Sequence, residues 1–299
     1  MFGWPSGSPA SPTTRSIVCE RKHACPGGTS FVNDIGSELG GPARPQDAGD
    51  VRLVGLTGVP MVMAGDDIAT IIFGALKSSG DQLQDGDVVV IAQKIISKAE
   101  DRFVDLSGVE TSQAATALAR KTGKDPRLVE LILRESVEVV AAREDVLIVA
   151  HRLGFVLANA GIDHSNVSGK PGHVLLLPVD PDKTAAGIRS KLHRLCGADI
   201  AVIINDSIGR AWRNGSIGMA IGASGLPALL DLRGRRDLDG RVLEVTEVGL
   251  ADEIASAASL VMGQANEGRP IVIVRGLGLP RGEGAAADLL RPKHRDLFR

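Results

Sequence analysis

Short apolar runs of strand length, separated by helical patterns, limit the possible folds of this chain more than any other feature. Valine and isoleucine dominate the runs VVVIA, AVIIN and IVIV, which are typical of buried strands. Segments with the apolar spacing of helices lie between and around them, at residues 66–79, 112–123, 126–136, 180–197 and 251–264. This mixture of strands and helices predicts an α+β fold.

The expected strands complete this picture. They cover residues 51–56, 173–179, 198–205 and 270–277, and residues 85–97 are expected to form a turn and a buried strand. A further stretch at residues 146–163 contains two β-branched runs broken at Leu153-Gly154, which predicts a hairpin that delivers residues 158–166 to an edge or cleft.

Charge and composition exclude several classes of function. With 34 basic and 36 acidic residues the formal net charge is −2, which disfavours a nucleic-acid partner. The three cysteines, Cys19, Cys25 and Cys196, are too few for a disulfide framework and have no zinc-site spacing. No apolar run approaches the roughly 18 residues of a membrane span. We therefore expect a cytoplasmic enzyme that does not enter the membrane.

The first 50 residues differ from the rest in composition. They are rich in glycine, proline and serine and show no sustained apolar period. We interpret residues 1–50 as a disordered tail, or as the product of a start codon assigned too early, and residues 51–299 as the folded region.

Two polar segments follow apolar strands, at residues 158–166 and 205–215. Strand ends are where open sheets place ligands. Asp163 and Asp206 are hard oxygen ligands of the kind that Mg²⁺ or Mn²⁺ prefers, and Ser207 adds a hydroxyl group beside the second. The alternative is that these polar residues simply close turns.

Cationic side chains near the strand ends are candidates for anion binding. Arg210 and Arg213 flank Trp212 and can face one phosphate or carboxylate, although they can equally be solvated arginines beside a structural tryptophan. Lys94 and Lys98 follow a buried strand, where lysine can contact a nucleotide phosphate or simply lie at the surface. The chain contains no GxxxxGK[ST] motif, and no GxGxxG follows a strand, so any nucleotide is held in another way.

Seven segments occur together in one order: GVPMVMAGDDIA, DGDVVVIAQKIISKAE, ANAGIDHSN, INDSIGRAWRNG, IGMAIGASG, LRGRRDLDGRVL and LVMGQANEGRPIVIVRG. In this arrangement the chain resembles the coenzyme F420-0:L-glutamate ligases over residues 51–279. It is similar to their stand-alone form, without the nitroreductase-like domain that follows in some members. The resemblance implies a two-lobed mixed α/β fold that forms an intertwined homodimer.

The resemblance also implies the substrates and the site. The substrates are coenzyme F420-0, L-glutamate and GTP, and the cations are Mn²⁺ or Mg²⁺ with potassium as a further aid. The implied metal ligands are Asp163, Asp206 and Ser207. The implied GTP contacts are Val59, Pro60, Met61, Val62, Gln93, Lys94, Lys98, Asn166, Gly263, Gln264, Ala265, Asn266, Glu267 and Gly268.

The implied reaction adds L-glutamate to F420-0 through an acyl phosphate and then adds further γ-linked glutamates. Asp163, Asp206, Arg210 and Arg213 are the expected catalytic residues. Two alternatives remain open: a GTP-dependent amide ligase for another small carboxylate, and a nucleotide-binding paralogue without activity. The chain departs from the family pattern at four positions, with Asn205 and Ser207 in place of threonine, Ala211 in place of proline and Asp101 in place of glycine.

Overall fold

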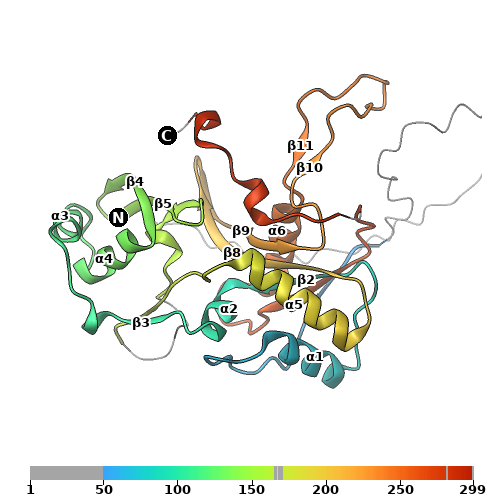
Figure 1. Ribbon diagram of the computed structural model, residues 1–299, viewed down its shortest axis with the longest axis horizontal. Helices are drawn as coiled ribbons and strands as arrows, with labels where there is room; N and C mark the ends of the chain where they lie inside the picture. The colour runs from blue at the N-terminus through green and yellow to red at the C-terminus, as the bar shows by residue number, and fades with distance from the viewer. Residues whose placement is uncertain (1–49, 165–166, 168–170, 281, 298–299) are drawn as a thin grey trace, which may run out of the picture. The chain divides into compact units, whose positions relative to one another are not determined.

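The computed structural model describes residues 50–164, 167, 171–280 and 282–297 (Figure 1). The predicted tail at residues 1–50 lies outside this part of the chain except for Asp50, which is exposed. Helices and strands mix along the described residues, and the α+β class is confirmed. The two lobes and the homodimer stay predictions.

A five-stranded mixed sheet forms the centre of the fold, with strand order β1-β12-β2-β8-β9. Its strands are β1 (Arg52–Gly55), β2 (Val88–Ala92), β8 (Ala201–Arg210), β9 (Arg213–Ser224) and β12 (Ile271–Arg275). β2 and β8 run parallel, and every other neighbouring pair is antiparallel. The carboxyl ends of β2 and β8 therefore meet at one edge of the sheet.

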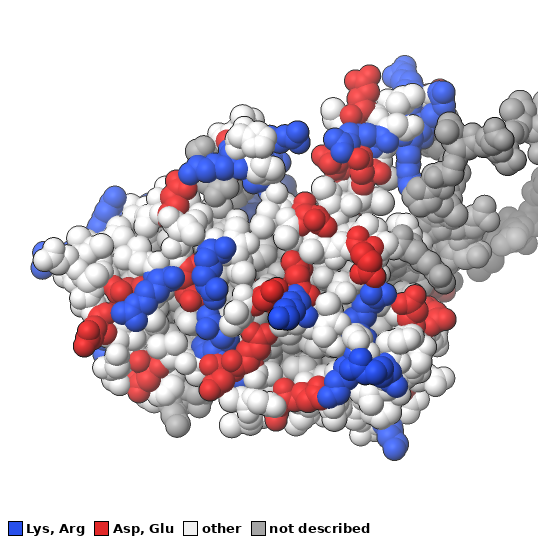
Figure 2. Space-filling view, in the orientation of Figure 1, with Lys and Arg blue, Asp and Glu red and all other residues white. Residues whose placement is uncertain are grey.

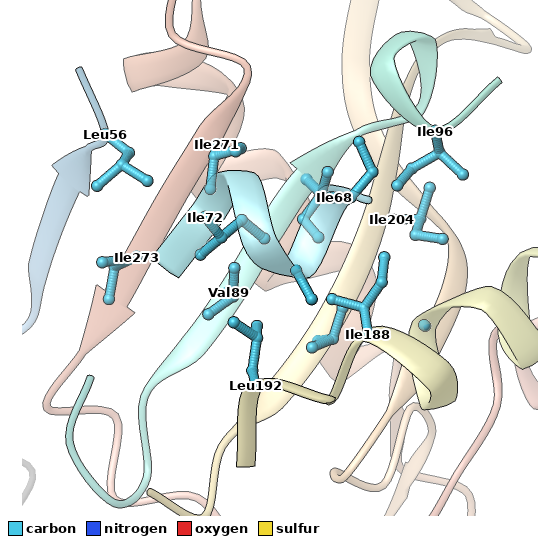
Figure 3. Packing of buried hydrophobic residues seen from close by; sticks show 14 of the residues in the cluster. Leu56, Ile68, Ile72, Val89, Ile96, Ile188, Leu192, Ile204, Ile271 and Ile273 are labelled. Atoms are coloured by element: carbon cyan, nitrogen blue, oxygen red, sulfur yellow. The ribbon is translucent and has the colours of Figure 1, made fainter. Parts of the chain in front are cut away.

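Both faces of this sheet are buried. In β2, Val89 and Ile91 pack into one apolar cluster, whereas Val88 and Val90 pack into another. Helices α1 (Ile68–Ser79) and α5 (Pro181–Cys196) cover the first face, and α6 (Leu250–Met262) covers the second. Figure 3 shows the first cluster, in which residues of α1 and α5 lie against the strands. Burial on two sides explains why these strands are continuous apolar runs in the sequence.

Local signals fix where the helices begin and end. The Asp67 side chain accepts a hydrogen bond from the backbone nitrogen of Thr70 and caps α1, which ends at Gly80 with φ of 71°. Ser112 caps α3 (Gln113–Thr122), Asp125 caps α4 (Pro126–Arg134), and Asp180 caps α5 in the same way. All five predicted long helices are present in the structure.

A three-stranded antiparallel sheet forms a separate part of the fold, with order β4 (Ser136–Arg143), β5 (Val146–His151) and β6 (Val156–Ala158). α3, α4 and this sheet enclose a third apolar cluster. The hairpin predicted at Leu153-Gly154 is confirmed as the β5–β6 connection.

The remaining elements are β3 (Phe103–Asp105) paired with β7 (His173–Leu175), β10 (Leu230–Asp231) paired with β11 (Glu247–Val248), and 3₁₀ turns at Leu106–Gly108, Asn159–Gly161, Ala286–Leu289 and Lys293–Arg295.

Two predictions about elements near the strand ends were wrong. The strand expected over residues 85–97 ends at Ala92, and α2 (Gln93–Ala99) begins at the next residue. The polar segment that starts at Asn205 is not a loop after a strand, because β8 continues to Arg210 and turns back at Ala211-Trp212. In neither place did the sequence pattern show where the strand ends. The end of a strand is set by its pairing with the neighbouring strand.

Charged side chains of both signs are interspersed on the face shown in Figure 2. The β10–β11 segment carries both signs itself: Arg233 Nη2 lies 2.6 Å from Asp231 Oδ2 and 3.3 Å from Glu247 Oε1. In the described part of the chain no helix has the length and apolar character needed to cross a membrane.

A cluster of charges around Glu135 connects the three-stranded sheet to the end of α2. Glu135 Oε2 lies 3.1 Å from Nη2 of both Arg102 and Arg152 and 3.5 Å from Nε2 of the buried His151. Arg102 Nε also donates to the Leu177 carbonyl at 2.8 Å. Burial alone would raise the pKa of Glu135, but the nearby His151 ring and the charges of Arg152 and Arg102 outweigh it and lower the pKa to about 2.

We predict that Glu135→Gln lowers the free energy of unfolding at pH 7 by about 2–3 kcal/mol. Because the folded-state pKa lies below the ordinary value of 4.5, this contribution is present above pH 4.5 and is lost as the pH falls towards 2. Urea unfolding of both proteins at pH 7, 5 and 3 measures it, with Glu244→Gln at an exposed position as control. An equal difference at pH 3 and pH 7 would contradict the prediction.

Asp101 occupies a backbone conformation that favours glycine. Its φ is 54°, and its backbone nitrogen donates to the Lys98 carbonyl at 3.1 Å in the turn that ends α2. The residue is exposed, so its side chain gains no packing in return for the backbone strain.

Asp101→Gly is therefore expected to stabilise the protein, by up to about 1 kcal/mol, because strain is relieved. Asp239→Gly is the matched control, since Asp239 is exposed and lies outside the left-handed region. Thermal unfolding should show a higher midpoint for the first variant and no gain for the second. A lower midpoint for Asp101→Gly would disprove the strain argument.

Candidate functional site

A cavity of about 580 Å³ lies at the edge where β2 and β8 end. Five parts of the chain line it: residues 59–62 after β1, residues 92–98 at the junction of β2 and α2, Asp163, residues 205–207 of β8, and residues 262–270 at the end of α6 and after it. Segments that are far apart in the sequence therefore meet at the carboxyl end of the parallel pair.

α2 directs two lysines towards this cavity. Because the helix begins directly after β2, Lys94 and Lys98 stand four residues apart on one helix face. Gln93 is buried and donates from Nε2 to Ser97 Oγ at 2.7 Å, which holds the first turn. Lys98 is 6% exposed, and burial, followed by the charge of Lys94, lowers the pKa of its ammonium group.

Asp163 is presented by an unusual turn. Asn159, Ala160 and Gly161 have φ values of 53°, 53° and 67°, so three successive residues lie in the left-handed region. The backbone of Asp163 then exchanges two hydrogen bonds with Leu175, at 2.9 and 3.0 Å. This combination fixes the backbone of Asp163 at the end of β7. Such strain is tolerated only where the surrounding structure enforces it, and it is frequent at functional sites.

The Asp163 carboxylate faces the lysines, but its negative charge is only partly compensated. Its Oδ1 lies 3.4 Å from Lys94 Nζ, whereas its Oδ2 is buried and has no hydrogen-bond partner. Burial raises the pKa of Asp163, and Lys94 opposes this effect only in part. A buried anionic oxygen without a partner is an electrostatic cost that a cation would remove.

Asp206 adds a second carboxylate from β8. Burial, and then the charge of Asp163, raise the pKa of Asp206 to about 7, although the backbone nitrogen of Ser207 donates to its Oδ1 at 2.8 Å. Ser207 Oγ lies beside it and donates to Gln264 Oε1 at 2.6 Å. Two carboxylates that repel one another, together with a hydroxyl group, fit a hard divalent cation.

The described residues hold no group of three or more histidine, cysteine, aspartate or glutamate side chains arranged for a metal. A cation bound by Asp163, Asp206 and Ser207 would therefore keep open positions for water or phosphate oxygens. This is the usual situation of Mg²⁺ in sites that bind nucleotides.

A glycine-containing loop closes one side of the cavity. α6 ends at Gly263, whose φ is 74° and where a Cβ atom would come within 2.1 Å of the Glu267 side chain. Glu267 in turn accepts a hydrogen bond from the backbone nitrogen of Ala265 at 2.8 Å. Gly263 thus lets the loop fold back on itself, and its residues up to Gly268 line the cavity.

The cavity brings most of the predicted site residues together. Its lining includes Val59, Pro60, Met61, Val62, Gln93, Lys94, Lys98, Asp163, Asp206, Ser207, Gly263, Gln264, Ala265, Asn266, Glu267 and Gly268. Asn166 lies outside the described residues. Over the residues that are described, the lining does not include Arg210 and Arg213, because these lie at the far end of β8 and the start of β9.

Six lining residues were not among the predicted contacts: Ala92, Ile95, Asn205, Met262, Arg269 and Pro270. Each is adjacent in sequence to a predicted residue or group of residues, so extending each segment by one or two positions would have found them. Asn205 is the most informative of them. It is 5% exposed, and its Nδ2 donates to Ser259 Oγ at 2.9 Å. It therefore ties the end of β8 that lines the cavity to α6.

Comparison with known proteins identifies the family of this chain. The family model described as F420-0:Gamma-glutamyl ligase matches residues 57–276. The coenzyme F420:L-glutamate ligase of Methanothermobacter thermautotrophicus is 49% identical over 251 residues, which are 83% of this chain and 99% of that protein. That of Methanopyrus kandleri is also 49% identical, over 80% of this chain and 93% of its own. The chain therefore belongs to the F420-0:gamma-glutamyl ligase family.

Proposed function

We propose that this protein attaches L-glutamate to coenzyme F420-0 with GTP as the energy source, and then adds further γ-linked glutamates. Family membership and the names of the relatives support the ligase activity. The observation that carries the proposal is the convergence of Lys94, Lys98, Asp163 and Asp206 in one cavity at the end of the β2–β8 pair. Mn²⁺ or Mg²⁺ is the proposed divalent cation, with K⁺ as a further cation.

The reaction divides into two steps. The terminal carboxylate of F420-0 attacks the γ-phosphate of GTP, which gives an acyl phosphate and GDP. The α-amine of L-glutamate then attacks the acyl carbon, forms the amide and releases phosphate. Both steps develop negative charge on phosphoryl oxygens, so the site must supply positive charge in a fixed position.

The side chains of the cavity are suited to this task. Lys94 and Lys98 hold phosphate oxygens, and the Asp163 carboxylate, 3.4 Å from Lys94 Nζ, keeps the first lysine in place. A divalent cation held by Asp163, Asp206 and Ser207 would offset charge on the phosphates. The low exposure of Lys98 strengthens its attraction for an anion, because little water competes.

We predict that Asp206→Asn lowers ligase turnover more than about 100-fold, because a neutral amide is a poor ligand for a hard cation. The assay supplies GTP, Mn²⁺ or Mg²⁺, L-glutamate and F420-0, and follows GDP release together with product mass in steps of one glutamate. Asp239→Asn, at an exposed position, is the matched control and should retain activity.

The outcomes of this assay separate the competing functions. Growth of F420-0 by glutamate units that is lost in Asp206→Asn supports the proposal. Release of GDP with another carboxylate acceptor, but not with F420-0, would identify a different amide ligase. Metal-dependent GTP binding without turnover on any acceptor would identify a non-catalytic paralogue and overturn the proposal.

The same substitution is expected to stabilise the metal-free protein. Because the pKa of Asp206 is raised to about 7 from 3.8, the ionised carboxylate destabilises the folded state increasingly as the pH rises from about 4 to about 7. In EDTA, Asp206→Asn should unfold at a higher temperature than the unchanged protein, by about 2–4 °C for each kcal/mol removed.

The difference should be larger at pH 8 than at pH 5, and Asp239→Asn should show none. Added Mn²⁺ should raise the unfolding temperature of the unchanged protein more than that of Asp206→Asn. A variant that is less stable than the unchanged protein at pH 8 in EDTA would show that Asp206 has a structural role instead.

A further inference from the structure

Helix α2 carries the two lysines of the cavity but is too short to be stable alone. It has 7 residues, whereas isolated helices shorter than about 12–15 residues are only marginally stable in water. Its position therefore depends on contacts with the rest of the fold. Ile96 packs into the first apolar cluster and fixes one side of the helix (Figure 3). The end of α2 that follows Lys98 is held by hydrogen bonds instead.

Glu100, the residue directly after α2, joins this end to the start of α5. Its Oε1 accepts a hydrogen bond from Thr184 Oγ1 at 2.7 Å, and its Oε2 accepts one from the backbone nitrogen of Val179 at 2.9 Å. Thr184 lies in the first turn of α5, and Val179 lies just before that helix. Because α5 packs across the first face of the central sheet, the carboxylate anchors the short helix to a rigid one.

The stability of α2 itself does not explain a carboxylate at position 100. The last carbonyl groups of a helix carry partial negative charge, so an acidic side chain beside them is unfavourable. Both groups that contact Glu100 donate hydrogen bonds to it, and a carboxylate has an oxygen for each of them. The side chain is therefore suited to its contact with the start of α5, at a small cost to the helix that it follows.

A displacement at Glu100 would be transmitted to the cavity. Lys98 lines the cavity and lies two residues before Glu100, which is about 3 Å along the helix axis. Ala99 lies between them, and its carbonyl oxygen accepts a hydrogen bond from the backbone nitrogen of Gly65 at 2.9 Å. Gly65 belongs to the segment after β1 whose residues 59–62 also line the cavity. The end of α2 is thus shared by two parts of the cavity wall.

We propose that Glu100 is a positioning residue, which holds α2 against α5 and so places Lys98 at the nucleotide phosphates. The inference rests on the proposed binding of GTP and gives a role in that binding to a contact outside the cavity. Over the described residues the lining includes neither Glu100 nor Thr184. A misplacement of about 1 Å caused far from the reacting groups can cost about 100-fold in rate, so a contact of this kind can control the site.

Nucleotide affinity tests this role without turnover. Calorimetric titration with GTP and Mg²⁺ should give a Kd about tenfold higher for Glu100→Ala than for the unchanged protein, because Lys98 is no longer held in place. Thr184→Val removes one of the two hydrogen bonds and keeps the shape of the side chain, so it should raise the Kd about threefold. Glu144→Ala, at an exposed position, is the matched control and should leave the Kd unchanged.

Glu100→Gln separates the position of the side chain from its charge. The amide oxygen of glutamine can accept the hydrogen bond from Val179, and its amide nitrogen can donate to the Thr184 hydroxyl group, which is also an acceptor. The two anchoring contacts are then kept without the negative charge. This variant should therefore bind GTP within about threefold of the unchanged protein.

Combination with Lys98→Met tests whether Glu100 acts through this lysine. In a protein that already carries Lys98→Met, Glu100→Ala should raise the Kd for GTP less than about threefold, because the side chain that it positions is absent. If the two residues acted independently, Glu100→Ala would raise the Kd about tenfold in this background as well. Thermal unfolding of each variant shows how much protein is folded at the temperature of the titration.

Several results would overturn the inference. A lower unfolding temperature of Glu100→Ala with an unchanged Kd for GTP would show that the contact only stabilises the fold. A Kd for Glu100→Gln as high as that for Glu100→Ala would show that the charge acts, not the position. If Glu100→Ala does not fold, an unchanged Kd for Thr184→Val decides against the inference. Failure of the unchanged protein to bind GTP would overturn the proposed nucleotide as well, whereas the other results leave it standing.

Discussion

The parallel pairing of β2 with β8 is the constraint on which the rest of the site depends. It brings the carboxyl ends of two buried strands to one edge, so that the helix after β2 and the continuation of β8 face the same space. The segment after β1 and the loop before β12 reach the same edge and complete the lining of the cavity. Apolar packing on both faces of the sheet holds this edge rigid. The position of the charged groups thus follows from the burial of valine and isoleucine side chains.

The site gathers charges that would not be stable together in a less rigid structure. Burial raises the pKa of both Asp163 and Asp206, the charge of Asp163 raises that of Asp206 further, and Lys98 is buried beside Lys94. The Glu135 cluster shows the opposite arrangement, in which three basic groups surround one carboxylate and lower its pKa. In the first set Asp163 Oδ2 has no hydrogen-bond partner, as expected for a group that acts on a ligand, whereas in the second the carboxylate is paired with two arginines and stabilises the fold.

Sequence patterns were sufficient for elements that depend on local signals. The long helices have apolar periodicity and capping residues such as Asp67 and Ser112, and they were predicted within a few residues. The start of α2 was missed because Ile95 and Ile96 resemble a continuation of the strand after Gln93-Lys94, and only the pairing of β2 with its neighbours decides where the strand ends. The residues of the cavity were found from the resemblance to related ligases. The remote position of Arg210 and Arg213 could not be predicted, since the polar residues before them gave no sign that β8 continues.

The left-handed turn before Asp163 restricts the substitutions that this part of the chain can accept. Ala160 is fully buried there, and a Cβ atom on Gly161 would come within 2.9 Å of both Leu157 and Leu177. Larger side chains at these two positions would push the chain outward and carry the Asp163 carboxylate with it. The turn contributes no side chain to the cavity lining, yet few substitutions are expected to be tolerated at Ala160 and Gly161. Sequence variation is therefore expected at other lining positions, such as those in the loop after α6, where side chains can change without moving the carboxylates.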